Sequence, residues 1–202
     1  MSLLRAFIAV EIPSALQNTI QNSTSTLRQS LGDEIVRWVP PQNIHLTLKF
    51  LGDISTSNLD LIKQMLIAET AQQKCFEMQI EDIGSFPNPK RPRVLWVGLR
   101  APAALESIQR AIVSACARLG YPSDEKNFSP HLTIGRVKQN LTFVEIQRIR
   151  FALEAMKIHS LGIAKVDAIH LFKSDLHPNG SVYTKLFSAP MGKAYEVNSG
   201  RT

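Results

Sequence analysis

Apolar residues follow two spacings along the chain, one typical of strands and one typical of helices. Runs rich in Ile, Val, Leu and Phe, bounded by Pro or Gly, predict strands. These predicted strands cover 3–12, 36–39, 44–51, 75–83, 94–99, 131–137, 158–172 and 182–187. Stretches with apolar residues three or four positions apart predict helices over 14–31, 57–73, 102–119 and 143–156.

Pro and Gly predict where these elements are interrupted. The stretches 84–93 and 121–129 are expected to be loops. The long strand 158–172 is expected to break or bulge near Gly162. The pair Asn179-Gly180 predicts a hairpin turn.

The order of the elements predicts an α+β fold. Strand, helix, strand, helix, strand occurs twice, which indicates two similar lobes of largely antiparallel sheet. We expect helices on the outer faces and a cleft between the lobes. No low-complexity segment separates the halves, so we expect a single bilobed domain over 1–190 and a polar tail over 191–202.

One short motif occurs in each half of the chain. Residues 45–48 are His-Leu-Thr-Leu, and residues 131–134 are His-Leu-Thr-Ile. Residues i and i+2 of a strand share a face, so His45 lies beside Thr47, and His131 beside Thr133. A single such motif is usually a half-exposed polar face. Two in corresponding positions favour one shared site across the cleft.

Two histidines and two threonines suit a particular chemistry. Imidazole has an ordinary pKa of ~6.5, so one neutral His can take a proton from water while a charged His protonates a leaving oxygen. Threonine hydroxyls can bind phosphate oxygens. The set fits hydrolysis of a cyclic phosphodiester without metal or cofactor. A zinc site is less favoured, because two His supply only two of the three or four ligands that zinc needs.

Composition adds a weaker indication of the partner. The chain has 202 residues, of which 44% are hydrophobic and 20% charged, as in ordinary globular proteins. Its net charge of +6 suits an anionic partner such as RNA. Cys75 and Cys116 form neither a metal motif nor a disulfide framework. We expect a soluble cytoplasmic monomer without a membrane partner, since the first apolar run is too short to span a bilayer.

With their flanking residues, the two motifs resemble the two-histidine phosphoesterase superfamily. The chain is most similar to the bacterial and archaeal RNA 2′,3′-cyclic phosphodiesterases, long called 2′–5′ RNA ligases. The resemblance runs from residue 5 to residue 186. It is carried by RAFIAVEIP, RWVPPQNIHLTLKFLG, FPNPKRPRVLWVG, FSPHLTIGR and LFKSDLHPNGSVYTKL.

The resemblance implies a bilobed fold with a pseudo-two-fold axis, with His45 and His131 as acid–base pair and Thr47 and Thr133 binding phosphate. The implied reaction is attack of water on a 2′,3′-cyclic phosphate end of RNA or a nucleotide, including tRNA fragments, which leaves a 2′-phosphate. The resemblance favours His131 as base and His45 as acid, although the nearly identical motifs leave both assignments open. The alternatives are a 2′–5′ RNA ligase acting on tRNA halves, a non-catalytic RNA-binding module and a metal hydrolase.

Arg136 follows the second motif closely, and the resemblance makes it a further candidate for substrate binding. Strict alternation would point it away from His131, but a bulge at Gly135 would turn it toward the site, to contact phosphate or the terminal base. Its counterpart Phe50 could stack on the base likewise, but packing in the core is favoured. Lys49 shares parity with the first motif and is expected at the cleft edge or in solvent.

Several other residues are given structural or surface roles. We expect packing for both tryptophans, and packing or a hydrogen bond into the site for Tyr183. The basic loop 90–93 is expected to be solvated, with contact to an RNA backbone as the alternative. The histidines that lack Thr two positions later are expected to be structural or exposed; they are His159, His170 and His177.

Overall fold

The computed structural model describes residues 2–122, 127–178 and 180–192. The nine strands of this part of the chain are β1 (Leu3–Glu11), β2 (Val36–Trp38), β3 (His45–Ser55), β4 (Phe76–Phe86), β5 (Val94–Arg100), β6 (His131–Val137), β7 (Gly162–Val166), β8 (Ala168–His177) and β9 (Gly180–Pro190). The α-helices are α1 (Ser14–Ser23), α2 (Ser25–Ile35), α3 (Leu59–Ala71), α4 (Ala103–Arg118) and α5 (Phe143–Ala155). None of the described helices is long and apolar enough to cross a membrane.

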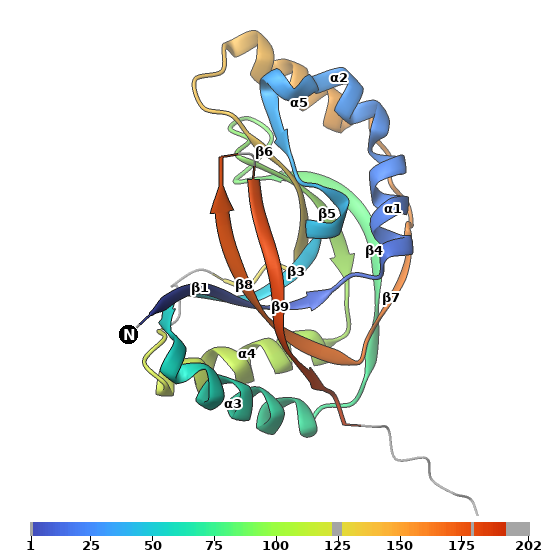
Figure 1. The fold of residues 1–202 in the computed structure, drawn as a ribbon. Coiled ribbons are helices and arrows are strands. Elements are labelled where there is room, and N and C mark those ends of the chain that lie inside the picture. Colours follow the sequence, from blue (N-terminus) through green and yellow to red (C-terminus); the bar gives the residue numbers. More distant parts are fainter. Residues whose placement is uncertain (1, 123–126, 179, 193–202) are drawn as a thin grey trace, which may run out of the picture.

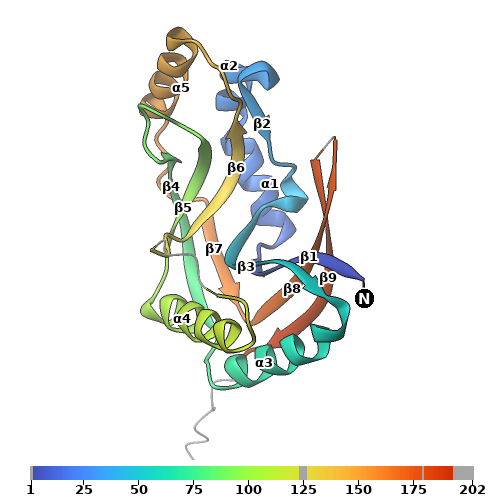
Figure 2. The same cartoon turned by 90° about the vertical axis from the view of Figure 1, so that its left-hand side faces the viewer.

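All the strands join one curled antiparallel sheet, in the order β7-β4-β5-β6-β3-β1-β8-β9, with β2 paired to β6. Figures 1 and 2 show α3 and α4 side by side at one end of the molecule and α2 and α5 at the other, with α1 leading from the middle toward α2. The α+β class is therefore confirmed, and so is the expected repetition of the fold. The two lobes share the sheet through their innermost strands, β3 and β6.

The two halves of the chain exchange strands and helices. Strand β4 comes from the first half but pairs with β5 and β7, whereas β8 comes from the second half and pairs with β1. Helix α3 packs against α4, and α2 against α5, so each pair contains one helix from each half. This exchange places the polar faces of β3 and β6 at the centre of the sheet.

Most predicted elements are present, and the differences have local causes. The helix predicted over 14–31 bends at Thr24, whose hydroxyl donates to the Ile20 carbonyl over 2.8 Å. Gly32, at φ +65°, then interrupts the regular helix as expected. Strand β3 continues beyond Gly52, because a bulge lets β1 pair with it as far as Ser55.

The start of the loop predicted at 84–93 is wrong, because β4 extends to Phe86. Gly84 pairs with Trp96, and a Cβ on Gly84 would lie 2.4 Å from the Trp96 ring. The glycine therefore allows a close approach between two strands instead of ending one. The stretch 158–172 breaks at Asp167, where the chain passes from β7, which pairs with β4, to β8, which pairs with β1.

The hairpin expected near Asn179 is supported by its surroundings. Asn179 itself lies outside the described residues, but His177 pairs with Gly180 across β8 and β9. The predicted polar tail after Pro190 also falls largely outside the description, which ends at Gly192.

Candidate active site

The two tetrapeptide motifs meet at the centre of the sheet. Leu46 of β3 lies opposite Leu132 of β6, and both leucines are buried in the main core. Because the two strands run antiparallel, the residues next to this leucine pair also face each other. His45 therefore lies across from Thr133, and His131 across from Thr47. All four polar residues are half-buried on the other face of the sheet. The structure therefore brings the four predicted residues together around an approximate two-fold axis.

Both imidazoles are oriented in the same way. His45 Nδ1 lies 2.7 Å from the Asn43 carbonyl oxygen, and His131 Nδ1 lies 2.7 Å from the Ser129 carbonyl oxygen. A carbonyl only accepts, so each Nδ1 carries the hydrogen and donates it. In each neutral ring Nε2 is then the basic nitrogen, and in each charged ring it is a donor. Either histidine can thus accept or supply a proton through Nε2.

Aromatic side chains surround both imidazoles. The ring of His45 lies 4.8 Å from Phe7 and 5.2 Å from Tyr183, which contacts it edge-on. The ring of His131 lies 4.9 Å from Phe86, also edge-on. Tyr183 therefore packs against the site. Of the aromatic rings around His45, Phe7 is itself stacked on Phe172 at 5.3 Å.

These surroundings set the protonation of the pair. Burial lowers the pKa of His45 and the pKa of His131, and the hydrogen bond to a backbone carbonyl partly opposes that effect. The positive charge of Arg136 lowers both pKa values further, and the charge of His131 lowers the pKa of His45. Both rings therefore favour the neutral form at pH 7, and a bound anion would favour protonation of one.

A bulge in β6 determines where Arg136 points. Thr133 pairs with Trp96 and Gly135 with Leu95, so Ile134 is an extra residue on β6. Ile134 and Gly135 are both buried, and Arg136 returns to the exposed face. The bulge expected at Gly135 is therefore present, and it turns Arg136 to the face of the sheet that carries His131 and Thr133.

Strand β3 repeats this bulge, which determines where Lys49 and Phe50 lie. Thr47 pairs with Ala9 and Lys49 with Ile8, so Leu48 is the extra residue. Lys49 is turned to the buried side, at 8% exposed, where its ammonium donates to the Pro122 carbonyl. Phe50 is 55% exposed. Lys49 therefore borders the cleft, as one of its two expectations had it, but is not solvated, and Phe50 is not a core residue.

The substitution Gly135→Ala is expected to destabilise the protein by about 1–3 kcal/mol. A Cβ on Gly135 would lie 2.6 Å from Val36 Cγ1 and 3.0 Å from the Trp38 ring, so β2 would have to move away from β6. The free energy of unfolding, measured in urea, checks this. An unchanged value would show that β2 yields without cost.

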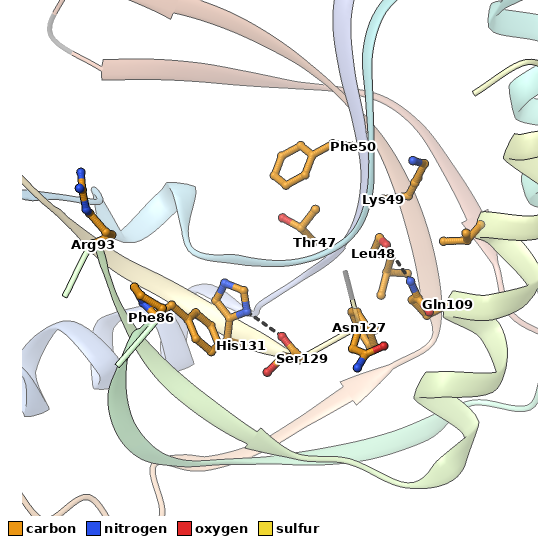
Figure 3. Close-up of a pocket in the computed structure, with 13 residues that line it drawn as sticks. Thr47, Leu48, Lys49, Phe50, Phe86, Arg93, Gln109, Asn127, Ser129 and His131 are labelled. Atoms are coloured by element: carbon orange, nitrogen blue, oxygen red, sulfur yellow. Dashed lines mark hydrogen bonds between the residues drawn. The ribbon is translucent and has the colours of Figure 1, made fainter. Parts of the chain in front are cut away.

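A pocket of about 660 Å³ opens beside the motifs and is drawn in Figure 3. Thr47 and His131 line it, with Phe50 and Phe86 as apolar walls and Arg93 at the end beyond Phe86. His45 and Thr133 lie outside this lining. The pocket therefore joins one His and one Thr of the site to a space large enough for a ligand beyond phosphate.

The remaining predicted residues fall outside the cleft. The ring of Trp38 stacks under the Arg28 guanidinium at 4.8 Å, and Trp96 packs on Gly84, so both tryptophans pack as expected. His170 is half-buried and bonded to Ser188 over 2.9 Å, whereas the other two histidines without a following Thr are exposed. Nowhere in residues 2–122, 127–178 and 180–192 do three or more His, Cys, Asp or Glu side chains gather as a metal site would require.

The aromatic surroundings of the site were missed in the sequence. Their signal is present in β1, where Phe7 and Ala9 occupy the face opposite Ile8 and Val10. The same alternation places Phe172 on the cleft side of β8, where it joins Phe7 in a small cluster apart from the main core. Aromatic residues at the cleft-facing positions of β1 and β8 therefore indicate that aromatic rings surround the site.

Comparison with known proteins agrees with this geometry. The family model of LigT-like phosphoesterases matches the chain twice, over residues 10–96 and 97–183. The RNA 2′,3′-cyclic phosphodiesterase of Methanothermobacter thermautotrophicus is 31% identical over 183 residues, which are 91% of this chain and 96% of the relative. That of Archaeoglobus fulgidus is 33% identical over 184 residues, 91% and 98% of the two chains. This chain belongs to the LigT-like phosphoesterase family.

The solved structures extend the comparison to the fold. Escherichia coli LigT complexed with ATP matches with a TM-score of 0.67 and 26% identity, over 95% of this chain and 99% of the other. The same protein has been solved with 3′-AMP and with phosphate. The two matched halves of the chain correspond to the two repeats of the sheet, each with one motif.

Proposed function

We propose that this protein hydrolyses RNA 2′,3′-cyclic phosphate ends to 2′-phosphate ends without a metal ion. The observation that carries the proposal is the pair of imidazoles with the same Nδ1-to-carbonyl bond, each across from the threonine of the other motif. The named activity of the relatives supports the same substrate.

The reaction needs one base and one acid on opposite sides of phosphorus. A neutral imidazole takes a proton from water through Nε2 as the water oxygen bonds to phosphorus. The bond from phosphorus to the 3′ oxygen breaks, and the charged imidazole gives its Nε2 proton to that oxygen. The products are a 2′-phosphate and a 3′-hydroxyl. We assign His131 as the base and His45 as the acid, as the family resemblance implies.

The other site residues bind the anion and the nucleoside. Hydroxyls of Thr47 and Thr133 donate to the non-bridging phosphate oxygens, and the exposed guanidinium of Arg136 balances their charge. The exposed ring of Phe50 offers a stacking surface for the terminal base at the pocket. Complexes of the related E. coli LigT with ATP and 3′-AMP support a nucleotide in this position.

The deciding experiment incubates the protein with an oligonucleotide bearing a 2′,3′-cyclic phosphate, with and without EDTA, and identifies the terminal product. Equal hydrolysis in both conditions, with a 2′-phosphate product, is expected. A 3′-phosphate product would contradict the direction of ring opening, and loss of activity in EDTA would contradict metal independence. Parallel incubation with tRNA halves tests the ligase alternative, which requires joined product to exceed hydrolysed product.

The pH dependence of kcat/KM is expected to be bell-shaped, with its falling limb beginning below ~6.5. The base must be neutral and the acid protonated, and burial followed by the Arg136 charge lowers the pKa of both imidazoles. In Arg136→Gln that charge is gone, so both pKa values rise and both limbs move to higher pH. Rate profiles and imidazole NMR titrations measure this.

The matched control for that profile is Arg148→Gln. Arg148 lies on α5, near Glu34, and loses the same charge away from the site. Limbs that move to lower pH in Arg136→Gln, or that move equally in the control, would contradict the assigned cause.

A further inference from the structure

We propose that Arg37 and Arg93 flank Arg136 in an arginine strip that extends binding from the cyclic phosphate to the phosphates preceding it. The preferred substrate is then an RNA strand instead of a mononucleotide. This inference rests on the proposed function and adds to it a binding surface that extends beyond the terminal nucleotide.

The first pair of the strip spans two strands. Arg37 of β2 lies directly opposite Arg136 of β6, and both side chains are exposed. Their neighbours Val36 and Trp38 crowd the other face of the sheet, where a Cβ on Gly135 would touch both. The two guanidiniums therefore share the face that carries the histidine and threonine of the second motif.

The third member continues the strip toward the pocket. Arg93 immediately precedes β5, whose first residue, Val94, pairs with Arg136. The Arg93 carbonyl accepts from the Val137 amide over 3.0 Å, which fixes it beside the end of β6. Its side chain lines the pocket together with His131. The strip therefore runs from the edge of the pocket at Arg93, across β6 at Arg136, to Arg37 on β2.

The charges of the strip have no opposing partner among the residues that the structure describes. No carboxylate in those residues lies within 4.0 Å of Arg37, Arg93 or Arg136, although other exposed arginines of the chain, such as Arg100 and Arg150, are paired in this way. Like charges directly opposite each other on neighbouring strands are destabilising. A bound polyanion removes that repulsion.

A strand of RNA matches this surface better than other anions that fit the site. Its cyclic end would occupy the motifs, and its next phosphates would follow at intervals along the strip. Arginine forks bind phosphate oxygens in pairs, without reading sequence. The strip is therefore expected to add affinity for any RNA sequence, in a salt-dependent way.

The test compares two substrates with the same terminal nucleoside, a nucleoside 2′,3′-cyclic phosphate and a short oligonucleotide ending in it. In Arg37→Gln, the ratio of kcat/KM for the oligonucleotide to that for the mononucleotide is expected to fall about fivefold to tenfold, and further in Arg37→Glu. The slope of log kcat/KM against log salt for the oligonucleotide should become shallower by ~0.7, the value for one contact to a single strand.

Arg148→Gln provides the control, since it removes one arginine from the helix side and should leave both ratio and slope unchanged. Thermal unfolding confirms that each variant is folded. An unchanged ratio and slope in folded Arg37→Glu, with wild-type hydrolysis of both substrates intact, would overturn the strip and leave the proposed function standing. Failure of the wild type to hydrolyse either substrate would overturn both.

Discussion

Replacement of His45 or His131 by alanine is expected to lower kcat by about 10²–10⁴-fold, the usual contribution of a positioned acid or base. In the proposed mechanism each Nε2 transfers the proton, and the Nδ1 of each ring is committed to a backbone carbonyl. Single-turnover hydrolysis of a cyclic-phosphate oligonucleotide measures the loss.

The double variant should be little slower than the worse single variant. Acid and base act in the same transition state, so the contribution of one depends on the presence of the other. His159→Ala is the matched control, because His159 is exposed and outside the site. If both single variants keep wild-type turnover, the non-catalytic RNA-binding alternative is favoured and the acid–base pair is wrong.

The same variants can assign the two roles. A substrate in which sulfur replaces the 3′ leaving oxygen needs little help from an acid, because a thiol has a much lower pKa than an alcohol, ~8.5 in cysteine. If His45 is the acid, His45→Ala should recover most of its rate on this substrate, whereas His131→Ala should not. The opposite pattern of rescue would exchange the roles.

The sequence is sufficient to predict the centre of this site, but not its surroundings. Alternation along β3 and β6 correctly places Leu46 and Leu132 in the core and the His and Thr of each motif on the other face. What alternation cannot supply is the pairing of these two strands. That pairing depends on the exchange of β4 and β8 between the halves, which no local pattern encodes.

Residues just beyond the motifs show where strict alternation fails. Each motif is followed by a bulge, which inserts one residue and reverses the direction of the residues that come next. Gly135 gave a local signal for the second bulge, so the direction of Arg136 could be anticipated. The first bulge has Lys49 at the same position, which gives no such signal, so alternation predicts neither the burial of Lys49 nor the exposure of Phe50.

The substitutions Thr47→Val and Thr133→Val are each expected to lower kcat/KM by about 10²-fold, as does the loss of one preorganised donor to a developing oxyanion. Valine keeps the branched shape and the strand preference of threonine, so the loss isolates the hydroxyl. Each hydroxyl lies across from the imidazole of the other motif, where the non-bridging oxygens would be held while the two rings exchange protons with water and the 3′ oxygen.

Two measurements separate this role from a structural one. The inhibition constant for inorganic phosphate should rise in both variants, because the lost donor binds phosphate in the ground state as well. The pH limbs of kcat/KM should stay in place, because a threonine hydroxyl carries no charge that would shift the pKa of His45 or His131.

Thr184→Val, on the exposed face of β9, is the control. Unchanged kcat/KM in both motif variants would show that backbone or guanidinium groups hold the phosphate instead. A fall in kcat/KM that parallels a fall in the free energy of unfolding would show that the threonines act by stabilising the fold.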